Sequence, residues 1–127
     1  SNGLITVFGG NQTRPNIHID DITDVYLHLI DAKGCIRGIY NAGFENISIL
    51  DIAKLVTKHI PAEIRVTESN DPRSYRVNSD KLLATGFSPK KSVEKAILEL
   101  CEKQNQGVLK NEDRFHNLKW MQATVFK

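Results

Sequence analysis

The sequence has little of what marks several large classes of protein. It contains two cysteines, Cys35 and Cys101, which are far apart and form no Cys-x-x-Cys motif, so we expect reduced thiols and a cytoplasmic location. No apolar run approaches the length of a membrane span, and no signal-peptide pattern is present. A formal net charge of +2, without a run of lysine or arginine, argues against nucleic-acid and membrane partners. The four histidines are too scattered along the chain to predict a metal site.

The length of the chain predicts one folded domain. A chain of 127 residues can bury about two thirds of the surface that it exposes when unfolded. There is no initiator Met, and Ser1-Asn2 resembles the remnant of a cleaved expression tag, so we expect a fragment of a longer protein. We expect residues 1–3 to be a tag remnant or linker, residues 4–107 to be the domain, and residues 108–127 to be a tail that packs on it.

Strands and helices are expected to alternate, which predicts an α/β, or mixed α+β, fold class. The expected strands cover residues 4–8, 16–19, 38–43 and 64–66. The expected helices cover residues 20–33, 49–60, 79–85 and 93–106. The first begins at an acidic pair, and the others follow the capping residues Ser48, Asn78 and Ser92. We expect Glu99 to pair with Lys103 on the last of these helices. The tail is expected to hold one helical turn.

The stretch from Arg14 to Asp31 organises the rest of the chain. Its apolar positions have the spacing of one helix face and are Ile22, Val25, Tyr26, Leu29 and Ile30. Asp20 or Asp21 is expected to cap the first free N–H groups of this helix. Pro15 restricts Arg14 to an extended conformation at the entrance. The adjacent His18 is interpreted as a structural histidine in preference to a general base.

Five short patterns occur in order between residues 4 and 104. They cover residues 5–10 (Ile-Thr-Val-Phe-Gly-Gly), 14–21 (Arg-Pro-Asn-Ile-His-Ile-Asp-Asp), 38–43 (Gly-Ile-Tyr-Asn-Ala-Gly), 71–75 (Asp-Pro-Arg-Ser-Tyr) and 83–89, which contains Thr-Gly-Phe-Ser-Pro. Together they resemble the C-terminal half of the extended short-chain dehydrogenases/reductases, the NAD-dependent sugar-nucleotide epimerases and dehydratases, including UDP-glucose 4-epimerase-like proteins. The resemblance implies the small substrate-binding domain of that fold, without its Rossmann core.

Two motifs of that family are missing from this sequence. The cofactor motif Gly-x-x-Gly-x-x-Gly does not occur, and the catalytic pair Tyr-x-x-x-Lys is also absent. The three tyrosines, Tyr26, Tyr40 and Tyr75, are followed four residues later by Ile30, Phe44 and Ser79. We therefore expect no catalytic, cofactor-binding or metal-binding residue here. The resemblance implies NAD(P) only for a full-length protein, and this chain alone is expected to be inactive.

The resemblance also implies which residues would bind substrate. Arg14 and Arg73 stand where relatives contact a diphosphate from two sides, and a guanidinium fork suits phosphate oxygens. The alternative is that both are solvated surface arginines. Thr6 and Phe8 stand where relatives lie along the nucleotide base, although Phe8 could instead be a core residue. Asn41 could line the cleft or make a structural pairing.

We therefore hypothesise that the chain is the nucleotide-sugar-binding portion of an NAD-dependent epimerase/dehydratase. The expected partners are a nucleotide sugar and an NAD-binding domain of the same protein, and pairing with a second copy of the chain stays open. Two alternatives stay open: a non-catalytic ligand- or protein-interaction module on the same scaffold, and part of a nucleotide-sugar 4,6-dehydratase or reductase. The base, the sugar and the outcome of the reaction are not specified by these residues.

Overall fold

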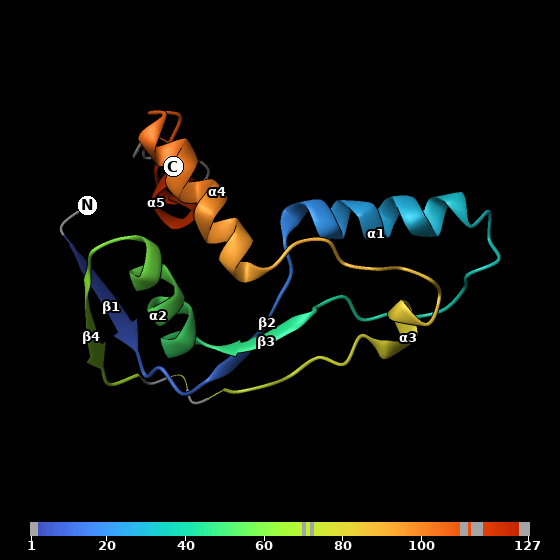
Figure 1. Ribbon diagram of the computed structural model, residues 1–127, viewed down its shortest axis with the longest axis horizontal. Helices are drawn as coiled ribbons and strands as arrows, with labels where there is room; N and C mark the ends of the chain where they lie inside the picture. Colours follow the sequence, from blue (N-terminus) through green and yellow to red (C-terminus); the bar gives the residue numbers. More distant parts are fainter. Residues whose placement is uncertain (1–2, 70, 72, 110–111, 113–115, 125–127) are drawn as a thin grey trace.

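The structure, a computed structural model, describes residues 3–69, 71, 73–109, 112 and 116–124. Its elements are, in chain order, β1 (Leu4–Phe8), β2 (Thr13–Asn16), α1 (Ile19–Asp31), β3 (Glu45–Ser48), α2 (Ile49–His59), β4 (Glu63–Thr67), α3 (Asp80–Leu83), α4 (Val93–Asn105) and α5 (Asn117–Thr124) (Figure 1). The expected tag remnant at Ser1-Asn2 lies outside the described residues, as does Pro72 of the pattern at residues 71–75. The division into domain and tail stays a prediction.

The described strands form two small sheets. β1 and β4 pair in parallel, with Val7 opposite Val66, and β2 and β3 pair antiparallel, with Arg14 opposite Ile47. Figure 1 shows α2 beside the parallel pair and the antiparallel pair running on toward α1. These small sheets and the helices between them confirm the mixed α/β class.

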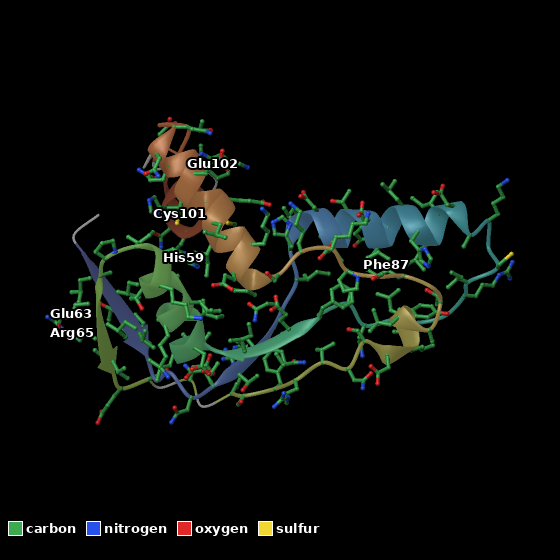
Figure 2. The ribbon with its side chains drawn as sticks, viewed as in Figure 1. His59, Glu63, Arg65, Phe87, Cys101 and Glu102 are labelled. Carbon is green, nitrogen blue, oxygen red and sulfur yellow. The ribbon has the colours of Figure 1, made fainter. Side chains whose placement is uncertain are left out.

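The helix α2 begins as its sequence predicts. The Ser48 hydroxyl accepts a hydrogen bond from the Asp51 N–H at 3.1 Å and donates one to the Asp51 carboxylate at 2.7 Å. Ala53 is buried, and α2 contacts both β1 and β4. At its other end the His59 ring lies 3.0 Å from the carboxylate of Glu94 at the start of α4 (Figure 2). The packing of α2 thus links the parallel sheet to α4.

The start of α1 differs from the prediction. The strand ends at Asn16, and the helix begins at Ile19 with His18, not an aspartate, as its cap. The Nδ1 atom of His18 accepts a hydrogen bond from the Asp20 N–H at 3.1 Å, so Nε2 carries the proton and faces the Glu99 carboxylate at 3.0 Å. The His18 side chain is 6% exposed, which confirms the structural interpretation of this histidine.

Asp21 does not cap α1 either, because its carboxylate binds a distant segment. It is 1% exposed, and its two oxygens accept hydrogen bonds from the N–H groups of Lys90 at 2.9 Å and Lys91 at 3.1 Å. The prediction of an Asp20 or Asp21 cap is therefore wrong. A buried carboxylate is stable here because two N–H donors replace water at its oxygens.

The packed side of α1 is also shifted from the expected stripe. Val25 is buried with Leu82 and Phe87 in the main apolar cluster, and Ile22 and Leu29 pack against it. Phe87 lies on the segment beneath α1 (Figure 2).

Tyr26 and Ile30 are expected on the packed face of α1, but they are 64% and 70% exposed. The expected stripe is wrong at these two positions because Asp21 and the ring of His28 occupy the packed side. His28 bonds Thr85 at 2.9 Å and meets Phe87 edge-on, with 5.7 Å between ring centroids.

The expected strand at residues 38–43 is not formed. Its backbone groups bind side chains of residues 79–81 instead of a neighbouring strand. The Ser79 hydroxyl bonds both the N–H and the carbonyl of Gly43 at 3.0 Å, and the Lys81 ammonium donates to the carbonyl of Ile39 at 2.9 Å. Gly38 also has a φ of +123°, outside the strand region.

The helix α4 follows its capping signal, because the Ser92 hydroxyl accepts a hydrogen bond from the Lys95 N–H at 3.1 Å. The prediction that Asn78 caps α3 is wrong: Ser79 holds the cap position without a side-chain cap hydrogen bond, and the Asn78 side chain accepts instead from the N–H of the first helical residue, Asp80, at 2.8 Å. The expected Glu99–Lys103 pair is not the one observed, since the Glu99 carboxylate binds Lys91 across the helix start. In the tail, the described residues include the helix α5 where one helical turn is expected.

The Asp21 contact generates a stability prediction. Asp21→Asn keeps one oxygen but points an amide N–H₂ at a backbone N–H, so the free energy of unfolding should fall by about 1–3 kcal/mol. Urea unfolding followed by circular dichroism measures this change. Asp31→Asn, an exposed position on the same helix, is the control and should change the free energy by less than about 0.5 kcal/mol. Equal stability of the two variants would contradict the assigned role of Asp21.

Candidate functional site

A pocket lies at the carboxyl ends of the parallel strands β1 and β4. Its volume is about 300 Å³ and it is lined by Gly9, Asn11, Gln12, Ser69, Asp71 and Ser74. Gly9 directly follows β1, and Ser69 follows β4 by two residues. The carboxyl edge of parallel strands is the usual position of ligand sites in open α/β sheets, which makes this pocket the candidate site.

The turn after β1 forms one wall of the pocket and is held by side-chain hydrogen bonds. The Gln12 amide donates to the carbonyl of Phe8 at 2.6 Å and accepts from the N–H of Gly10 at 2.5 Å. Gly9 has a φ of +79°, and a Cβ atom there would lie 2.8 Å from the Gln12 amide oxygen. Only glycine fits this position without strain, so the pocket wall is defined by the Gly9-Gly10 sequence.

Another lining residue, Asp71, brings both predicted arginines to its carboxylate, although neither arginine lines the pocket itself. The Asp71 oxygens accept hydrogen bonds from Nε and Nη2 of Arg73 at 2.7 and 2.8 Å, which is a bidentate pairing. The Nη2 atom of Arg14 lies 3.4 Å from the same carboxylate. Arg14 also donates to the backbone carbonyl of Arg73. The structure therefore places Arg14 and Arg73 side by side.

Arg14 and Arg73 differ in how firmly they are held. The Arg14 side chain is 22% exposed, and its guanidinium carbon lies 5.1 Å from the centre of the Tyr75 ring, a cation–π contact. The pairing of β2 with β3 fixes the backbone of Arg14. The Arg73 side chain is 79% exposed and is held by Asp71. Arg14 is thus held by the protein and is not a freely solvated surface arginine.

The charges of Asp71 and Arg73 stabilise each other. The hydrogen bond from the Arg73 side chain, followed by that from its backbone N–H, lowers the pKa of Asp71 from 3.8 to about 2. The same hydrogen bond raises the pKa of Arg73. Asp71 is therefore an anion at neutral pH. Two guanidinium groups and one carboxylate leave a single net positive charge beside the pocket.

Thr6 and Phe8 lie on the face of β1 that is turned away from the buried Val7. Phe8 is 62% exposed, so the alternative that it belongs to the core is not what the structure shows. Thr6 is in register with Arg65, which Figure 2 labels at the outer side of β4. Phe8 immediately precedes Gly9, a lining residue of the pocket, but is not itself among the lining residues.

Asn41 lies apart from this pocket. Its amide donates to the carbonyl of Asn78 at 3.4 Å, in the irregular segment before β3. A second hollow, of about 450 Å³, runs nearby and is lined by residues that include Phe44, Arg76 and Ser79, but not Asn41. The structure therefore gives Asn41 a structural pairing, and its role in binding stays a prediction.

Sequence reasoning did not assign Asp71 a role, although the structure makes it the centre of the charged group. The signal in the sequence is an acidic and a basic residue separated by one position in a polar loop. Ser74 was also missed, and its hydroxyl accepts a hydrogen bond from the Thr13 N–H at 2.9 Å, which joins the loop to β2. Neither contact has a periodic pattern that would reveal it.

A cluster at the start of α1 has the composition of a cation site. Ligand atoms of His18, Asp20 and Glu99 lie within 4.8 Å of one another. The ammonium of Lys91 already binds Glu99 and lies 3.4 Å from Asp20. Both His18 ring nitrogens are used in hydrogen bonds within the protein. The cluster is thus satisfied by its own lysine, and the described residues do not favour a metal here.

The lowered pKa of Asp71 gives a direct test of the charged group. Its carboxyl should titrate at about pH 2, and in Arg73→Ala the titration should move up toward 3.8. Because the pKa is lowered by folding, the pairing contributes to stability above about pH 4 and loses that contribution as the pH falls toward 2. Carboxyl ¹³C NMR measures the midpoint. Arg37→Ala is the matched control and should leave it unchanged; a midpoint near 3.8 in the parent would contradict the pairing.

Comparison with known proteins shows a likeness to a solved structure. No family model matches the chain. The chain is similar to a solved structure of RMD from Pseudomonas aeruginosa complexed with NADPH, with a TM-score of 0.61 and 18% sequence identity. The match covers 76% of this chain and 33% of that one, so the chain spans about a third of the length of RMD.

This likeness bears on the fold. It supports the small mixed α/β fold, which this chain shares with part of RMD. Among the described residues, none of the helices is both long enough and apolar enough to traverse a bilayer.

Proposed function

We propose that the pocket binds the diphosphate of a nucleotide sugar, and that the chain is the nucleotide-sugar-binding portion of an NAD(P)-dependent epimerase/dehydratase. The observation that carries this proposal is the convergence of Arg14 and Arg73 on one carboxylate at the carboxyl edge of β1 and β4. A carboxylate presents two oxygens much as a phosphate does, so the arrangement that holds Asp71 also suits a phosphate group.

The exposed ring of Phe8 supports a nucleotide as the ligand. It lies one residue from the pocket wall and offers an unpartnered aromatic surface to a base, while Thr6 continues the same face of β1. The pocket volume of about 300 Å³ is at the lower end for small-molecule sites and suits part of a nucleotide sugar. The sugar would extend beyond the described residues.

The described residues do not fit a dinucleotide cofactor. Such a site needs a glycine-rich turn that leads from a strand into a helix N-terminus, where N–H groups meet the pyrophosphate. Here the Gly9-Gly10 turn leads from β1 into the strand β2. We therefore place NAD(P) binding and the redox chemistry in a longer protein, of which RMD, complexed with NADPH, is a structural example. In that protein this chain would hold and orient the substrate.

The role of the arginines is tested by substitution. Arg14→Ala and Arg73→Ala should each weaken binding of a nucleoside diphosphate by about ten- to a hundredfold, because each removes a charged hydrogen bond worth about 1.5–3 kcal/mol. Isothermal titration calorimetry with UDP, dTDP, GDP and CDP measures the affinity and identifies the base. Arg37→Ala, which removes an exposed arginine bonded to the carbonyl of Gly34, is the matched control and should bind as the parent does.

Two results would contradict this proposal. One is the absence of binding by any of the four nucleoside diphosphates at millimolar concentration. The other is parent-like affinity in both arginine variants, since the diphosphate would then be held elsewhere.

The contribution of Phe8 separates base binding from diphosphate binding. Phe8→Ala should weaken the binding of nucleoside diphosphates by about fivefold or more, because an aromatic contact with a base is worth about 1–3 kcal/mol. The same variant should leave the affinity for inorganic pyrophosphate unchanged. Phe8→Tyr keeps the ring and is expected to retain nucleotide affinity. An unchanged affinity of Phe8→Ala for nucleoside diphosphates would contradict a contact between Phe8 and the base.

A further inference from the structure

The side of Arg73 that suits a phosphate is occupied by the protein itself. The Nε and Nη2 atoms of Arg73 form the fork that bidentate recognition uses, and both donate to Asp71, at 2.7 and 2.8 Å. The nearest atom of Arg14 to that carboxylate, Nη2, lies 3.4 Å away. The donors that the proposed ligand needs are therefore already paired.

We propose that Asp71 is an internal competitor for the diphosphate site: its carboxylate occupies the arginine fork without ligand, and the diphosphate has to displace it. This inference rests on the function proposed above. It makes Asp71 a residue that sets the affinity and the charge selectivity of the site, a role that differs from contacting the ligand.

Two properties make Asp71 a competitor that can be displaced. It is separated from Arg73 by one residue, so its effective concentration at the guanidinium is high and the fork is kept in place without ligand. The pair is also accessible to water, with the Arg73 and Asp71 side chains 79% and 40% exposed, and exposed ion pairs are weak because water screens them. Such a contact orients the arginine but yields to a stronger anion.

The competition predicts a preference for ligands with more than one negative charge. With Asp71 in place, the two guanidinium groups keep one net positive charge. A monoanion gains little by replacing a carboxylate of equal charge, whereas a diphosphate brings at least two charges and more acceptor oxygens. Asp71 also stays ionised well below neutral pH, because Arg73 lowers its pKa to about 2, so its own charge does not change between pH 5 and 8.

The test uses the whole chain and inorganic pyrophosphate, which probes the anion site without a base. Asp71→Asn removes the competing charge and should bind pyrophosphate roughly three- to tenfold more tightly than the parent, with a smaller gain for inorganic phosphate. Asp31→Asn changes the net charge by the same amount at an exposed position of α1 and should bind as the parent does. Asp71→Ser removes the same charge and is used if the Asn variant does not fold.

Each outcome of the calorimetry has a defined meaning. Equal or weaker pyrophosphate binding by both Asp71 variants overturns the proposal that Asp71 competes with the ligand. Asp71 would then either have no effect on binding or support it. If nucleoside diphosphates still bind the parent in that case, the proposed binding of a diphosphate by Arg14 and Arg73 stands without a competing role for Asp71. A tightening that also occurs in Asp31→Asn overturns the proposal in favour of a general charge effect. Absence of pyrophosphate and nucleotide binding in every variant overturns both proposals.

Discussion

The arrangement of this domain depends on a buried carboxylate that binds backbone N–H groups far along the chain. Asp21 on α1 accepts hydrogen bonds from Lys90 and Lys91, which directly precede the helix α4. The cap residue His18 adds a second link from α1 to α4 through Glu99. Because α4 packs on α2, and α2 on β1 and β4, these contacts connect α1 to the strands that carry the candidate site.

The candidate site is built differently from the core that supports it. The core relies on apolar burial around Val25, Leu82 and Phe87. The site relies on charge balance and on turn geometry, with a positive-φ glycine in the pocket lining and two arginines around the carboxylate of a second lining residue, Asp71. A site of this kind holds its charged groups in place before a ligand arrives, which lowers the ordering cost of binding.

Local signals in the sequence predict a large part of this fold, and long-range contacts account for the rest. Ser48 and Ser92 are found as helix caps because their hydrogen bonds span only three residues. Asp21 was misread as a cap because its partners lie 69 and 70 positions away. The strand at residues 38–43 fails for the same reason, since distant side chains take its backbone groups. The resemblance indicates Arg14 and Arg73, but the position of Asp71 between them depends on the folded loop.

The walls of the pocket come from segments that are distant in the sequence. Arg14 bonds residues 57 and 59 positions away, and Thr13 bonds Ser74 at a separation of 61. Closing so long a loop costs conformational entropy before any contact in the pocket can form, so such pairings are slow to assemble. The candidate site is therefore complete only once these distant segments have come together. A local opening of the loop around Asp71 would abolish the site while the cluster beneath α1 stays packed.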